Sequence, residues 1–69
     1  MVQNNSNEVM FSEYPDVVSV KDLIKMLSIS RSTALSLLQN QTIPNFKIGR
    51  IYKIPKKCVI KYIESQIKE

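Results

Sequence analysis

The stretch SVKDLIKMLSISRSTALSLLQN, residues 19–40, contains two short amphipathic segments, and a serine precedes each of them. In the first segment, Ser19 and Asp22 have the spacing of a helix capping box, in which the hydroxyl and the carboxylate each accept a backbone N–H. Apolar residues then recur at helical spacing, at Val20, Leu23, Ile24 and Leu27. These features predict a helix over residues 20–27.

A second helix is predicted after only three residues, because Ser30 is again a residue type that caps helix N-termini. The apolar positions expected to face inward are Ala34, Leu35, Leu37 and Leu38. The outer face is polar and lacks acids; it holds Arg31, Ser32, Thr33, Ser36, Gln39 and Asn40. Two helices joined by so short a turn must cross steeply, with Ile29 buried in the turn and the small Ala34 at the close approach. The arrangement predicts a helix-turn-helix, whose second helix enters the major groove of DNA, with an αα-corner of a small bundle as the alternative.

The chain beyond residue 40 predicts a β-hairpin. Pro44 cannot continue a helix, and residues 46–54 alternate in polarity around Gly49. Gly49-Arg50 suits a two-residue turn, which would pair Ile48 with Ile51 and Phe46 with Lys53.

A three-residue loop, residues 49–51, would pair the hairpin differently. It sets Ile48 opposite Tyr52 and Phe46 opposite Ile54, so that four large apolar side chains share one face. We favour this register because of that burial. It would also place Lys47 and Lys53 together on the other face, with Arg50 at the tip, an arrangement that is easier to understand if phosphate lies against it.

The last segment predicts a helix opened by Pro55, whose fixed φ suits a first helical position. The expected inward stripe is Val59, Ile60, Ile63 and Ile67, with Cys58 and Tyr62 at the flanks of the core. The bases expected to lie outward near the start of this helix are Lys56, Lys57 and Lys61. Positive charge at a helix N-terminus opposes the helix dipole, so helix stability does not explain these lysines.

Charge is distributed unevenly along the chain. Residues 1–16 carry only acids, whereas residues 23–63 carry eight bases and no acid, within a net charge of +4. A stretch of uniform positive charge repels itself on folding, which favours nucleic acid as a partner over a merely solubilising surface.

Length and composition exclude several classes of protein. A chain of 69 residues with 43% hydrophobic residues fits one small domain, expected over residues 18–69, after a flexible N-terminal arm, residues 1–17. No long apolar run or signal peptide is present, so we expect a cytoplasmic protein without a membrane segment. The chain has no histidine and a single cysteine, Cys58. We therefore expect no catalytic residues, no metal site and no cofactor, and hence no enzyme.

From Ser19 to Glu64 the chain resembles the excisionase-type helix-turn-helix family, small winged-helix DNA binders related to the MerR N-terminal domain. The matching pieces are VSVKDLIKML, SISRSTALSLL and IPNFKIGRIYKIP, followed by a helix. The resemblance implies a mostly α fold with a small β-hairpin, a winged helix-turn-helix made of two crossing helices, a two-stranded wing and a C-terminal helix. It implies that the second helix lies in the major groove and the wing on the flanking minor groove or backbone.

The family usually has glycine in the turn between the helices and again after the second helix, where this chain has Ser28 and Gln41. Both positions tend to need a left-handed backbone, in which residues other than glycine are strained by about 1 kcal/mol. Asn40 is an alternative carrier of the second left-handed conformation.

The resemblance places Arg31, Ser32, Thr33 and Arg50 at the DNA. Together with the basic and hydroxyl side chains around them, the expected DNA-binding residues are Arg31, Ser32, Thr33, Ser36, Lys47, Arg50, Lys53, Lys56 and Lys57. Arg31 is expected to be the main reader, and the lysines of the wing and last helix, Lys61 included, are expected to position the protein on phosphates.

Two uses of DNA binding follow. We rank first an excisionase-like accessory factor that shapes DNA for a mobile-element integrase, because so short a chain leaves no room for a ligand-sensing domain. A small transcriptional regulator of a mobile element or phage is the alternative use. A further alternative, which does not involve DNA, is a protein–protein interaction module whose basic face docks on an acidic protein. RNA binding is disfavoured because the exposed faces lack paired aromatics. We expect a monomer in solution, with tandem copies on double-stranded DNA.

Overall fold

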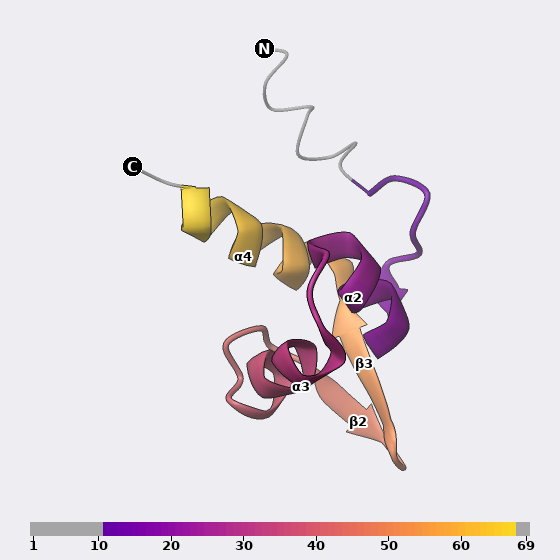
Figure 1. The fold of residues 1–69 in the computed structure, drawn as a ribbon. Coiled ribbons are helices and arrows are strands. Elements are labelled where there is room, and N and C mark those ends of the chain that lie inside the picture. The colour runs from indigo at the N-terminus through magenta and orange to yellow at the C-terminus, as the bar shows by residue number, and fades with distance from the viewer. Residues whose placement is uncertain (1–10, 68–69) are drawn as a thin grey trace.

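The computed structural model describes residues 11–67, which form three helices and a three-stranded antiparallel sheet (Figure 1). Their order along the chain is β1 (Val17–Val18), α2 (Val20–Leu27), α3 (Arg31–Gln39), β2 (Phe46–Ile48), β3 (Ile51–Pro55) and α4 (Lys56–Ile67). In the sheet, β3 lies between β1 and β2. Helices α2 and α4 pack on β3, α3 packs on α2, and the β2–β3 turn projects away from the helices (Figure 1). The mostly α fold with a small β-hairpin is as predicted, whereas the third strand, β1, was not predicted.

The two N-terminal caps form as the sequence predicts, and α2 has the predicted bounds. The Ser19 N–H donates to Asp22 Oδ2 and the Asp22 N–H donates to Ser19 Oγ, both at 3.2 Å. Ser30 Oγ accepts the Thr33 N–H, also at 3.2 Å. These local bonds set where each helix begins, and therefore which side chains face the core.

The core lies between the three helices and the inner face of the sheet. Its buried side chains are Val18, Leu23, Met26, Ala34, Leu38, Ile43, Ile54 and Val59. Ala34 is fully buried, as expected for the position where the two helices approach. Met26 is buried, whereas Leu27, which was predicted to belong to the inward apolar stripe, is half-buried. Ile29, predicted to be buried in the turn, is half-buried as well. Ile43, a core residue that the sequence analysis missed, is held after α3 by its N–H, which donates to the Leu37 carbonyl at 3.3 Å.

Left-handed backbone occurs at Ser28, with φ 55°, and at Gln41, with φ 59°, the two positions where the family usually has glycine. Asn40 has φ −83° and caps α3 in the right-handed region, so the alternative that assigned the left-handed residue to Asn40 is wrong. The Ser28 N–H donates to the Ile24 carbonyl and the Ile29 N–H donates to the same oxygen at 3.2 Å. The short turn between α2 and α3 therefore depends on one strained serine.

The strain at Ser28 gives a stability prediction. Ser28→Gly is expected to raise the free energy of unfolding by about 0.5–1 kcal/mol, because glycine adopts this φ without a Cβ clash. This net gain already includes the opposing effect that glycine increases the conformational entropy of the unfolded chain. Urea denaturation followed by circular dichroism measures the change. Ser36→Gly is the matched control, since the same substitution inside α3 should instead destabilise by about 0.5–1 kcal/mol. Equal destabilisation by both variants would contradict the strain at Ser28.

The hairpin has the two-residue turn, and the three-residue loop favoured by the sequence analysis is wrong. Phe46 pairs with Lys53, Lys47 with Tyr52 and Ile48 with Ile51. Gly49 has φ +65° and Arg50 is not among the positive-φ residues, which fits a type II′ turn. Turn geometry thus prevails over side-chain burial.

This register changes which hairpin residues face the core. Tyr52 and Ile54 share the inner face with Lys47, whose Nζ lies 4.8 Å from the centroid of the Tyr52 ring. Lys53 belongs to the outer face, so the predicted Lys47–Lys53 pair does not form. Phe46 is half exposed on that outer face, where burial was expected.

Helix α4 begins one residue later than predicted. Pro55 remains in the sheet as the partner of Val17, and the Lys56 N–H donates to the Asp16 carbonyl at 2.7 Å. Val59 is buried, and the side chains packed beside it are Cys58, Tyr62 and Ile63. Ile67, predicted to face inward, is 68% exposed because α4 extends beyond the rest of the core.

Residues 11–17, expected to belong to a flexible arm, pack against the rest of the protein. Phe11 and Tyr14 pack against the core, and their two rings contact each other edge to face, with centroids 5.9 Å apart. Val17 and Val18 add β1 to the sheet. Residues 1–10 of the predicted arm lie outside the described residues. The packed part of the chain therefore extends back to Phe11, past the boundary expected at residue 18.

Candidate nucleic-acid interface

A basic groove runs between α3 and the hairpin. It has a volume of about 340 Å³ and is lined by Ser19, Val20, Lys21, Arg31, Leu35, Arg50, Ile51 and Tyr52. Its cations come from three elements: Lys21 from the first turn of α2, Arg31 from the start of α3, and Arg50 from the hairpin turn. Among residues 11–67, no acidic side chain lines this groove. We call it the α3–wing groove.

Helix α3 presents its polar face to solvent beside this groove. Ala34 and Leu38, four residues apart, are buried, so the helical period turns Ser32 and Ser36 outward, and both are exposed. Arg31 and Thr33 are exposed as well. Ser32, Thr33 and Ser36 therefore share the solvent-facing side of α3, and Arg31 lies at its N-terminal end, where it lines the groove.

The cap of α3 constrains one of these hydroxyls. Ser30 Oγ accepts the Thr33 N–H and also donates its proton to Thr33 Oγ1 at 3.0 Å. Thr33 Oγ1 keeps its own proton for donation to a ligand. Ser30 thus orients Thr33 while it holds the first turn of α3, which carries Arg31.

The predicted basic residues of the hairpin do not gather on one surface. Arg50 is exposed at the turn and shares the α3–wing groove with Arg31. Lys47 lies over the Tyr52 ring on the inner face, and Lys53 is half-buried on the outer face. The structure therefore brings together the two arginines and separates the two lysines.

Lys56 is not outward, contrary to the sequence prediction. Its Nζ donates to the carbonyls of Phe11 at 3.3 Å and Tyr14 at 2.9 Å, and the side chain is half-buried. The lysine thereby ties the N-terminal segment to α4. Lys57 and Lys61 are exposed as expected, but neither lines the α3–wing groove.

Two residues with roles near the interface were missed by the sequence analysis. Lys21 lines the α3–wing groove from the first turn of α2, but it is not among the expected DNA-binding residues. Asn45 Nδ2 donates to the carbonyls of Leu38 at 2.9 Å and Ile43 at 2.8 Å. Asn45 therefore caps the end of α3 and fixes the loop to β2, which no local pattern indicated.

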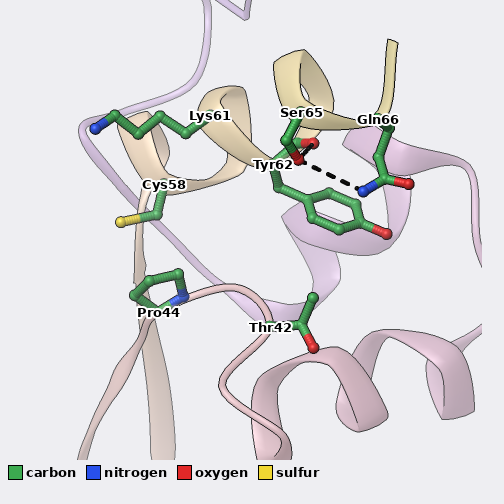
Figure 2. Close-up of a pocket in the computed structure, with 7 residues that line it drawn as sticks. All are labelled: Thr42, Pro44, Cys58, Lys61, Tyr62, Ser65 and Gln66. Atoms are coloured by element: carbon green, nitrogen blue, oxygen red, sulfur yellow. Dashed lines mark hydrogen bonds between the residues drawn. The ribbon is translucent and has the colours of Figure 1, made fainter. Parts of the chain in front are cut away.

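A second hollow, of about 260 Å³, lies between α4 and the loop after α3 (Figure 2). Its lining residues are Thr42, Pro44, Cys58, Lys61, Tyr62, Ser65 and Gln66. Ser65 Oγ donates to the Tyr62 carbonyl at 2.8 Å, and the Tyr62 ring extends from α4 toward Thr42 (Figure 2). This second hollow shares no lining residue with the α3–wing groove.

Within residues 11–67, no helix has the length and apolar character needed to cross a membrane. The same part of the chain holds no group of three His, Cys, Asp or Glu side chains that could bind a metal ion.

The model of a family described as a helix-turn-helix domain matches residues 17–67, from the first residue of β1 to the last of α4. No curated protein and no solved structure matches the chain. The matched residues include both helices, the short turn between them and the hairpin. The chain therefore belongs to this helix-turn-helix domain family, whose members are small DNA-binding domains.

Proposed function

We propose that this protein is a winged helix-turn-helix that binds double-stranded DNA in a sequence-specific manner, with α3 in the major groove and the hairpin turn on the flanking minor groove or backbone. The observation that carries the proposal is the α3–wing groove, where Arg31 and Arg50 from separate elements line one acid-free surface. Cations that converge beside an exposed polar helix suit a polyanion whose grooves expose base edges.

Arg31 is the proposed reader of sequence. A guanidinium can donate two parallel hydrogen bonds to O6 and N7 of guanine, and Arg31 is exposed at the N-terminus of α3. The exposed hydroxyls of Ser32, Thr33 and Ser36 suit phosphate oxygens or base edges. Arg50 and Lys21, at the rim of the groove, suit phosphates and set the position of α3.

Selection of duplexes from a random library, followed by binding measurements on single variants, tests this assignment. Arg31→Ala is expected to weaken binding to the selected duplex by about 1–3 kcal/mol and to relax the base preference at one position. Arg50→Ala should weaken all duplexes alike. Lys25→Ala removes an exposed charge outside the groove, and is expected to change neither affinity nor preference appreciably. If Arg31→Ala were as insensitive to sequence as Arg50→Ala, α3 would not be the recognition helix.

The proposed biological use is an excisionase-like accessory role, in which bound copies shape the DNA path for a cognate mobile-element integrase. One domain of this size covers about one half-site, so tandem copies or a partner protein would supply the remaining specificity. The resemblance described above supports this role. The alternative is a small transcriptional regulator of a mobile element or phage. Circularly permuted DNA fragments carrying the selected site distinguish the two: bent DNA and stimulated excision favour the accessory factor, and straight DNA with no effect on excision favours the regulator.

A further inference from the structure

The outer face of the sheet is apolar although it faces solvent. Large hydrophobic side chains exposed within the described residues include Val17 at 43%, Phe46 at 48%, Ile48 at 59% and Ile51 at 58%, and the strand register puts all four on this face. The solvent face of an antiparallel sheet is ordinarily polar. The most exposed pair, Ile48 and Ile51, is also the pair nearest the hairpin turn.

Ile48 and Ile51 lie directly opposite each other, next to Gly49 and Arg50. Side chains of such a cross-strand pair have Cβ atoms about 5 Å apart, so the two isoleucines form one apolar ridge. Arg50 follows at the tip of the same hairpin and is exposed. The tip of the β2–β3 hairpin is therefore a small apolar wedge, formed by Ile48 and Ile51, with the charged Arg50 at its end.

The residues around the wedge favour DNA, and not an apolar protein surface, as its binding partner. Ile51 lines the α3–wing groove together with Arg31 and Arg50. Residues 46–57 contain five bases and no acid. A wedge continuous with a cationic groove suits the minor groove, where deoxyribose walls are apolar and phosphates flank them.

We propose that Ile48 and Ile51 insert as an apolar wedge at a base step in the minor groove, so that the bound DNA is bent. Apolar side chains that enter the minor groove partly unstack base steps and kink the duplex by about 20–90° toward the major groove. This inference rests on the proposed DNA binding and adds to it the residues that would deform the duplex.

The test compares the unsubstituted protein with the double variant Ile48→Thr/Ile51→Thr. Threonine keeps the β-branch that suits a strand while it replaces a hydrocarbon arm with a hydroxyl. Phe46→Thr is the matched control, because Phe46 is also exposed on the outer face but lies two residue pairs farther from the tip than Ile48 and outside the α3–wing groove. Fluorescence energy transfer between the ends of a selected duplex of about 30 base pairs reports the bend, and titrations at several salt concentrations report phosphate contacts. The single variant Ile48→Thr replaces the double variant if thermal melting shows that the latter is unfolded.

We expect the unsubstituted protein and Phe46→Thr to bend the duplex equally. The isoleucine variant is expected to lose at least half of the bend while it keeps the salt dependence. An unchanged bend in the isoleucine variant overturns the wedge. So does an equal loss in Phe46→Thr, because the effect on the bend would then not be specific to the two isoleucines at the tip. Salt-dependent binding to straight DNA by the unsubstituted protein overturns the wedge alone, whereas no binding at all overturns the proposed function as well.

Discussion

The affinity of this protein for duplex DNA is expected to fall about 200-fold between about 50 mM and 200 mM salt. Each phosphate neutralised by a bound cation releases counterions, and the slope of log K against log salt is about −0.9 per contact. Exposed or groove-lining cations available for such contacts include Lys21, Arg31, Arg50 and Lys57, with the half-buried Lys53 beside them. Roughly four to five contacts give a slope of about 4 in magnitude. Filter binding over a salt series measures it.

Two lysine variants sharpen this measurement. Lys53→Ala is expected to weaken all duplexes alike and to lower the magnitude of the slope by about one. Lys56→Ala should leave the slope unchanged, because the Lys56 ammonium already donates to the carbonyls of Phe11 and Tyr14. A slope near zero for the unsubstituted protein would exclude DNA as the partner. A lower slope in Lys56→Ala alone would show that Lys56 leaves those carbonyls for phosphate.

Leu23→Ala is expected to lower the free energy of unfolding by about 2–5 kcal/mol. The Leu23 side chain is 0% exposed at the centre of the core, so the truncation loses apolar burial and leaves a cavity. A single core in a chain of this size rarely supplies more than about 3–5 kcal/mol, and the variant is therefore expected to be partly unfolded at room temperature. Urea denaturation followed by circular dichroism measures the loss.

Ile67→Ala is the control for Leu23→Ala. Both variants shorten an aliphatic side chain in a helix, but Ile67 is 68% exposed. Its free energy of unfolding is expected to stay within about 0.5 kcal/mol of the unsubstituted value. A comparable loss in both variants would contradict burial as the source of the effect, because alanine raises helix propensity at both positions.

Part of the candidate interface could be predicted from the sequence, and part of it could not. The exposed hydroxyl face of α3 could be predicted, because a helix that buries Ala34 and Leu38 must turn Ser32 and Ser36 outward. The groove itself could not. Lys21, Arg31 and Arg50 belong to three separate elements, and only the tertiary fold brings them to one groove.

The sequence by itself determined the two helices and their caps, since Ser19, Asp22 and Ser30 act within one helical turn. The left-handed positions, Ser28 and Gln41, were indicated by the family resemblance, since the family usually has glycine there. Only the tertiary structure decided the hairpin register and the place of Lys56. In the hairpin, local turn geometry competed with burial across strands, and the rest of the core, with Ile43 and Val18 in place, did not require Phe46. For Lys56, the decisive partners are the carbonyls of Phe11 and Tyr14, more than forty residues earlier in the chain, a separation over which residue spacing carries no information about contact.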